Sequence, residues 1–159
     1  MRKIDALLSE YGESHKNATN KTIHWICVPL IFFSIVALIA SIPAGPLEKM
    51  AGETDAFTNW ATIVLLLATV YYVSLSIPLA IGLVLFAVGC LQVAFFISRL
   101  NILPLWQAAL IIFVLAWVGQ FYGHKIEGKK PSFLKDIQFL LIGPAWLMHF
   151  IYKRIRIPY

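Results

Sequence analysis

The residues of this sequence whose type best suits chemistry are four histidines, His15, His24, His124 and His149. Neutral imidazoles are good ligands for iron, zinc, copper and nickel, whereas calcium and magnesium prefer oxygen ligands. Four histidines are too few for the histidine-rich di-iron hydroxylases of membranes, so the composition favours a mononuclear metal site. The competing interpretation is structural, because histidines are also common at a membrane interface.

The first two histidines are nine residues apart and would lie on opposite faces of an unbroken helix. His15 and His24 therefore face one site only if the backbone breaks between them. Asn17 and Asn20 supply such a break, because asparagine favours turns and helix N-caps. We expect Asn20 to cap the helix that carries His24. Alternatively, the two amides orient the imidazoles as hydrogen-bond partners of the ligands.

A second group combines an amide, an imidazole and a carboxylate. Gln120, His124 and Glu127 have spacings of four and three, so they share one helical face if the helix continues to Glu127. This face then offers a metal ligand with a hydrogen-bonding amide and a possible general base. For Glu127 alone, an equally simple interpretation is a helix end that pairs with Lys16 or Lys130.

The composition excludes a soluble protein, since 60% of residues are apolar and only 13% are charged. Residues 60–98 contain no Asp, Glu, Lys or Arg. As one helix this segment would be about 58 Å long, about twice the thickness of a hydrocarbon core, so it must contain two membrane spans. The net charge of +5 is better explained by orientation in a membrane and by anionic headgroups than by nucleic acid.

The elements that must position the histidines are therefore membrane helices, and the chain is predicted to form one all-α integral membrane domain over residues 1–159. Four spans are predicted, over residues 26–43, 60–77, 78–98 and 104–121. A further apolar segment, residues 137–152, contains Gly143 and Pro144, and we expect it to be a re-entrant or interfacial segment broken at this pair.

The basic residues orient these spans. Of the 13 lysines and arginines, all but Lys49 and Arg99 precede the first span, follow the fourth or close the chain. By the positive-inside rule both termini face the cytosol, and residues 44–59 face the opposite side. This topology places all four histidines at the cytosolic face of a multi-pass protein, in the inner membrane if the source is bacterial.

Two sequence strings resemble the motifs of the 2-hydroxy fatty acid dioxygenases, a family of small membrane proteins. Residues 11–24 read YGESHKNATNKTIH and are followed by Pro29, and residues 120–127 read QFYGHKIE and are followed by Pro131. Gly143 and Pro144 fall where the family has a C-terminal apolar hairpin. The resemblance spans nearly the whole chain. Fungal members act at the endoplasmic reticulum on products of phytosphingosine breakdown, which would be the location of a eukaryotic protein.

The resemblance implies an iron(II)-dependent dioxygenase of fatty acid α-oxidation, in which a long-chain 2-hydroxy fatty acid reacts with O2 and loses its carboxyl carbon as CO2. It implies that His15, His24 and His124 hold one iron(II) ion, with His149 as a further ligand where relatives have histidine or glutamate. Glu127 or a histidine that does not bind iron would take the hydroxyl proton. Lys16 and Lys125 belong to a basic rim that would attract the substrate carboxylate.

Two other functions remain open from the sequence. The first is a membrane haem protein in which two histidines are the axial ligands. The second is a membrane scaffold or a small transporter without enzymatic activity. A transporter normally needs polar groups near the middle of the membrane, and the predicted spans contain few beyond Gln92.

Overall fold

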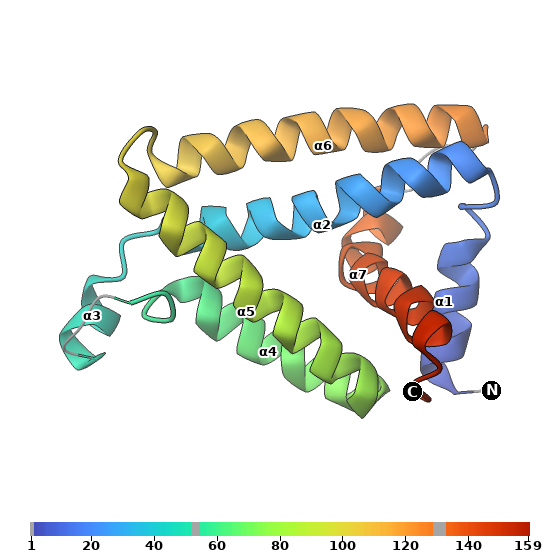
Figure 1. Cartoon of the computed structure of the whole chain (residues 1–159), viewed down its shortest axis with the longest axis horizontal. Helices are drawn as coiled ribbons and strands as arrows, with labels where there is room; N and C mark the ends of the chain where they lie inside the picture. The colour runs from blue at the N-terminus through green and yellow to red at the C-terminus, as the bar shows by residue number, and fades with distance from the viewer. Residues whose placement is uncertain (1, 52–54, 129–132) are drawn as a thin grey trace.

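The computed structural model describes residues 2–51, 55–128 and 133–159, and these residues form α-helices and no strand (Figure 1). The predicted all-α class is therefore confirmed for the described residues. The helices are α1 (Lys3–Gly12), α2 (Ala18–Ala40), α3 (Gly45–Ala51), α4 (Trp60–Leu75), α5 (Ile77–Leu100), α6 (Leu105–Glu127) and α7 (Phe133–Ile155).

Three helices, α2, α5 and α6, are long and apolar enough to cross a membrane. The predicted second span corresponds to α4, which has 16 residues. At 1.5 Å per residue it is about 24 Å long, which is shorter than a hydrocarbon core of about 30 Å. The described residues thus support a membrane protein with three helices of spanning length, and the prediction of four such spans is not confirmed.

The turn inside the long uncharged segment lies close to the predicted boundary between residues 77 and 78. α4 ends at Leu75 and α5 begins at Ile77, so Ser76 alone separates the two helices. Pro78 lies in the first turn of α5, where its missing N–H needs no partner and its fixed φ angle suits a helix. The two helices run back side by side, as Figure 1 shows.

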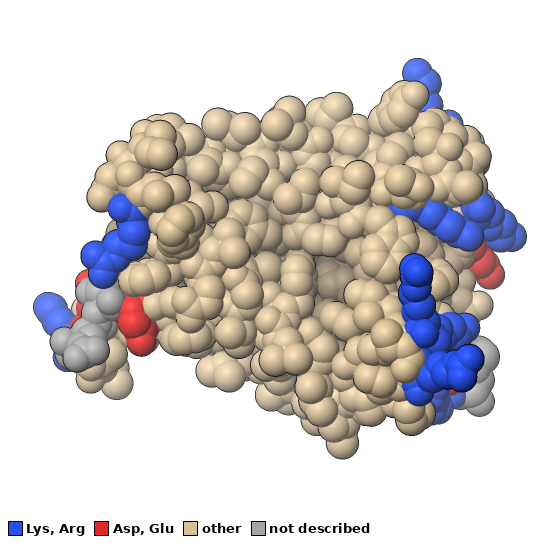
Figure 2. Space-filling view, in the orientation of Figure 1, with Lys and Arg blue, Asp and Glu red and all other residues tan. Residues whose placement is uncertain are grey.

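The surface has the charge distribution of a membrane protein. Figure 2 shows lysines and arginines at the two ends of the molecule, with a broad uncharged band between them. Large apolar side chains are exposed within the helices, including Leu67 on α4, Leu85 on α5 and Leu115 on α6, each about two-thirds exposed. Such exposure suits contact with lipid rather than water. Both chain termini lie at the end of the bundle that also holds the start of α2 and the end of α6.

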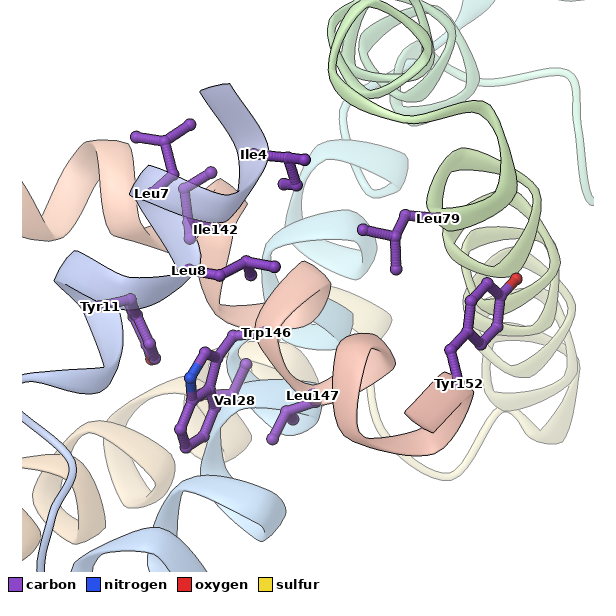
Figure 3. Packing of buried hydrophobic residues seen from close by; sticks show 10 residues of the cluster. All are labelled: Ile4, Leu7, Leu8, Tyr11, Val28, Leu79, Ile142, Trp146, Leu147 and Tyr152. Atoms are coloured by element: carbon purple, nitrogen blue, oxygen red, sulfur yellow. The ribbon is translucent and has the colours of Figure 1, made fainter. Parts of the chain in front are cut away.

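The main core joins α1 and α7 at that end of the bundle. Ile4, Leu7, Leu8 and Tyr11 form the buried face of α1 at helical spacing. They pack against α7, and Figure 3 shows Tyr11 beside Trp146 in this core. Because this packing holds α1 in place, it also fixes the start of the segment that connects α1 to α2.

The C-terminal segment differs from its prediction. α7 is one helix that continues through Gly143 and Pro144, so the break predicted at this pair is wrong. A proline inside a helix removes a backbone hydrogen bond and disturbs the preceding turn. The hydroxyl group of Tyr72, on α4, donates a hydrogen bond of 2.7 Å to the Leu141 carbonyl in that turn. Such a side chain from a neighbouring helix lets a membrane helix tolerate its proline.

Candidate metal centre

Three of the four histidines meet at the end of the bundle where α1, the start of α2 and the end of α6 come together. One ligand atom from each of His15, His24 and His124 lies within 4.8 Å of the others. The ring centroids are 4.1 Å apart for His15 and His24, 5.0 Å for His24 and His124, and 5.5 Å for His15 and His124. His15 and His24 are buried, and His124 is half-buried. The group has the composition and the compactness of a metal site.

The break predicted between the first two histidines is present. α1 ends at Gly12 and α2 begins at Ala18, so His15 lies in the connecting segment and His24 lies almost two turns into α2. The cap is Asn17, whose side-chain oxygen accepts hydrogen bonds from the backbone N–H of Thr19 and of Asn20. The expectation that Asn20 would be the cap is therefore wrong.

The hydrogen bonds of two imidazoles fix the tautomer that a metal needs. Nδ1 of His15 lies 2.6 Å from the Tyr11 carbonyl oxygen, and Nδ1 of His24 lies 2.9 Å from the Asn20 carbonyl oxygen. A carbonyl only accepts, so each Nδ1 carries the proton and donates it. Nε2 of each ring then keeps a lone pair, which is the usual arrangement of metal-binding histidines.

The surroundings of the two Nε2 atoms, on His15 and His24, show whether a metal ion fits this site. Both are buried and have no hydrogen-bond partner among the described residues. A buried nitrogen left without a partner costs about 1–3 kcal/mol, so a pair of them facing one histidine cluster indicates a missing ligand. Burial also lowers the pKa of His15 to about 4, which keeps this imidazole neutral near pH 7. The site therefore fits a metal ion that prefers nitrogen ligands.

An aromatic wall holds the His15 ring. The Tyr11 ring stacks on it with 4.3 Å between centroids and an angle of 12° between planes. The indole of Trp146 packs against both rings, at 5.2 Å from each. The sequence analysis missed these two residues. The spacing of four between Tyr11 and His15 was a signal for the first, whereas Trp146 comes from α7 and no local pattern reveals it.

Glu127 binds the segment that carries His15. Its carboxylate accepts hydrogen bonds from the backbone N–H of Lys16 at 2.9 Å and of Asn17 at 3.0 Å, and from the side-chain amide of Asn20 at 3.0 Å. The contact with Lys16 is thus made through the main chain and not through the ammonium group. Lys130, the other partner considered for Glu127, lies outside the described residues.

The face predicted for the end of α6 is formed, because this helix runs without interruption to Glu127. It ends at Gly128, whose φ of 73° lies in the left-handed region that glycine adopts without strain. Gln120 is 7% exposed and lies one turn from His124 on the same face. The basic side chains of Lys16 and Lys125 are exposed at this end of the bundle.

The fourth histidine is not part of the cluster. His149 lies on α7, where its ring contacts Phe150 and Tyr159 and its Nδ1 is hydrogen-bonded to the Tyr159 hydroxyl group. It does not belong to the group of residues whose ligand atoms converge. Because α7 continues as one helix through Pro144, Trp146 contacts His15 and His149 lies about one turn farther along. The structure thus does not support His149 as a metal ligand.

Comparison with known proteins identifies the family of the chain. The chain belongs to the Mpo1-like family, described as 2-hydroxy-palmitic acid dioxygenase Mpo1-like, whose model matches residues 1–155. No curated protein and no solved structure gives a significant match to the chain. The resemblance noted from the two histidine motifs is therefore confirmed at the level of the family.

Proposed function

We propose that this protein is an iron(II)-dependent dioxygenase that removes the carboxyl carbon of long-chain 2-hydroxy fatty acids. The observation that carries the proposal is the pair of buried Nε2 lone pairs on His15 and His24, next to His124, in a chain of this family. A 2-hydroxy acid and one O2 balance to the acid one carbon shorter, CO2 and water. The reaction therefore needs no 2-oxoglutarate and no external reductant.

His15, His24 and His124 would hold one iron(II) ion. When bound, this ion would supply a Lewis acid for the carboxylate and 2-hydroxyl oxygens of the substrate and the redox chemistry that O2 requires. Two of the three histidines, His15 and His24, are fixed in the neutral tautomer with a free Nε2. The positive charge of the site is thus left available for an anionic substrate.

Other residues of the chain would bind and orient the substrate. Gln120 places a buried amide on the His124 face of α6, where its N–H groups can bind the substrate carboxylate. Lys16 and Lys125 would attract the carboxylate from the exposed rim. The hydroxyl proton needs an acceptor, and the candidate bases are Glu127 and a histidine outside the metal group.

The fold offers the acyl chain a hydrocarbon environment. The uncharged band in Figure 2 adjoins the end of the bundle that holds the histidines. We infer that the acyl chain lies along the helices while the carboxyl head reaches the metal site at the cytosolic face. With both termini cytosolic, the protein would reside in a bacterial inner membrane or, in a eukaryote, in the endoplasmic reticulum.

The alternatives from the sequence fit the geometry less well. Two axial histidines of a haem lie on opposite sides of a flat macrocycle, whereas here each of the three rings stands within 5.5 Å of the other two. The third ring would occupy the space of the macrocycle. Gln92, the polar residue considered for a transporter, is exposed on the outer face of α5 and does not line a buried path.

The test uses anaerobically purified protein loaded with iron(II). We expect about one iron per chain, and conversion of 2-hydroxypalmitic acid on addition of O2. Palmitic acid should not react, since it lacks the second chelating oxygen and the alcohol to be oxidised. His24→Ala should lose both iron and turnover, because it removes a ligand whose lone pair faces the cluster. Full iron occupancy in His24→Ala, or no conversion by iron-loaded wild type, would refute the proposal.

A further inference from the structure

We propose that Glu127 and Asn20 act together as positioning residues that fix the His15 segment, and that Glu127 serves metal binding rather than proton transfer. This inference rests on the proposed function in one respect, since it takes the three histidines as the metal ligands. In this proposal Glu127 affects metal binding indirectly, because it holds the main chain of the segment that carries His15. Its support is a set of hydrogen bonds on both sides of His15.

His15 is the one member of the three-histidine group that is not on a helix, so something other than helix geometry must hold it. On its N-terminal side, the Ser14 carbonyl accepts a hydrogen bond of 3.1 Å from the Asn20 side-chain amide. On its C-terminal side, the Lys16 N–H donates a hydrogen bond of 2.9 Å to Glu127. The backbone is thus fixed at the residue before and the residue after the ligand.

The two anchors come from the helices that carry the other two ligands. Asn20 lies on α2 one turn before His24, and Glu127 lies on α6 about one turn after His124. They also bind each other, because the amide of Asn20 donates to Glu127 at 3.0 Å. The positions of all three imidazoles are therefore linked through one hydrogen-bonded network.

The orientation of the Asn20 amide follows from its partners. Both of its contacts, the Ser14 carbonyl and the Glu127 carboxylate, are acceptors, so the NH2 group must face them. Its oxygen then faces Gly123 on α6, where a glycine leaves room for it. Asn20 is fully buried, so its amide has little room to turn.

The Glu127 carboxylate already accepts hydrogen bonds from other groups of the protein. Glu127 accepts from two backbone N–H groups and one amide, which leaves few lone pairs for a substrate proton. Removing the charge weakens each of these bonds, since hydrogen bonds to an ionised acceptor are about twice as strong as neutral ones. The expected consequence is a displaced His15 and a weaker metal site.

The experiment compares Glu127→Gln and Glu127→Ala with wild type, using cobalt(II) as a spectroscopic probe and iron(II) for turnover. Glutamine keeps one oxygen for the backbone N–H groups, and alanine keeps none. We expect cobalt affinity to fall about 10–100-fold in Glu127→Gln, as for other partners of metal-ligating residues, and further in Glu127→Ala. The visible cobalt spectrum should change with it, and saturating iron should restore turnover of Glu127→Gln.

The matched control is Glu48→Gln, at the other end of the molecule, which should bind cobalt as wild type does. A general base would give the opposite pattern, with wild-type cobalt affinity and spectrum in both Glu127 variants and no turnover at any iron concentration. That result would overturn this inference and leave the proposed function intact. A wild-type protein that binds neither cobalt nor iron would refute the proposed function itself.

Discussion

Gly123→Ala is the smallest change that should disturb the metal centre without touching a ligand. Gly123 lies on α6 one residue before His124, and its Cα faces the side chain of Asn20. A Cβ added there would lie well inside 3.0 Å of the Asn20 amide oxygen, closer than real Cβ atoms approach other atoms. The amide is fully buried and bonded on its other side, so it has no free space to enter.

The size of the effect follows from the displacement that the methyl group requires. An ordinary contact begins near 3.4 Å, so the amide oxygen must move by about 1 Å. That movement forces the amide out of the geometry of its hydrogen bonds to Ser14 and Glu127, now 3.1 Å and 3.0 Å, and so weakens or breaks them. Their loss costs about 2–4 kcal/mol, and the better helix propensity of alanine returns about 1 kcal/mol.

The expected net destabilisation is therefore about 1–3 kcal/mol, accompanied by weaker metal binding. The control is Gly89→Ala on α5, where an added Cβ meets no atom within 4 Å. It should be neutral or stabilising by up to about 1 kcal/mol. Thermal unfolding in detergent and cobalt titration of both variants check the difference. If Gly123→Ala matches Gly89→Ala in both measurements, the packing of Asn20 against α6 does not control the site.

Three further predictions follow from other contacts. Gln120→Leu should retain iron but lower kcat/KM for 2-hydroxypalmitic acid about 10–100-fold, because it removes a hydrogen bond to the charged carboxylate of the substrate. An unchanged kcat/KM would exclude Gln120 from substrate binding. Tyr72→Phe should lower stability by about 1 kcal/mol, because the Leu141 carbonyl loses its hydroxyl donor, whereas Tyr122→Phe, on an exposed ring, should not. Iron(II) at about 100 times its dissociation constant should stabilise the folded protein by about 2.7 kcal/mol, so a chelator should lower Tm. An equal Tm with and without metal would argue against a metal site in the folded protein.

The grouping of three histidines was largely predictable from the sequence, because hydropathy and spacing are local properties. The uncharged segment predicted two helices that meet near residues 77–78, and α4 and α5 are joined at Ser76. Because successive spans cross the membrane in opposite directions, the start of the first span and the end of the fourth were expected at the same end of the molecule. These are the start of α2 and the end of α6. His15, His24 and His124 do meet there, whereas His149, which the same topology placed on that face, lies outside the group.

The remaining features depend on contacts between segments far apart in the chain. α7 continues through Pro144, and Tyr72, on α4, donates a hydrogen bond to the Leu141 carbonyl in the preceding turn. This continuity places Trp146 rather than His149 against His15, and no pattern within residues 137–152 shows it. The sequence alone did not show which asparagine caps α2, because Asn17 and Asn20 have the same local propensity for a cap. In the structure the Asn17 side chain caps the helix, and the Asn20 side chain binds Glu127 instead.

The proposed reaction is an iron-dependent oxidation that releases the carboxyl carbon of a 2-hydroxy fatty acid. The most direct measurement uses 2-hydroxypalmitic acid labelled with carbon-13 at the carboxyl group, iron-loaded wild type and O2, without 2-oxoglutarate or NADPH. We expect labelled CO2 and unlabelled pentadecanoic acid in equal amounts, with one O2 consumed per molecule of substrate. Label that stays in an intact 2-hydroxy acid, or in any product of unchanged chain length, would contradict it.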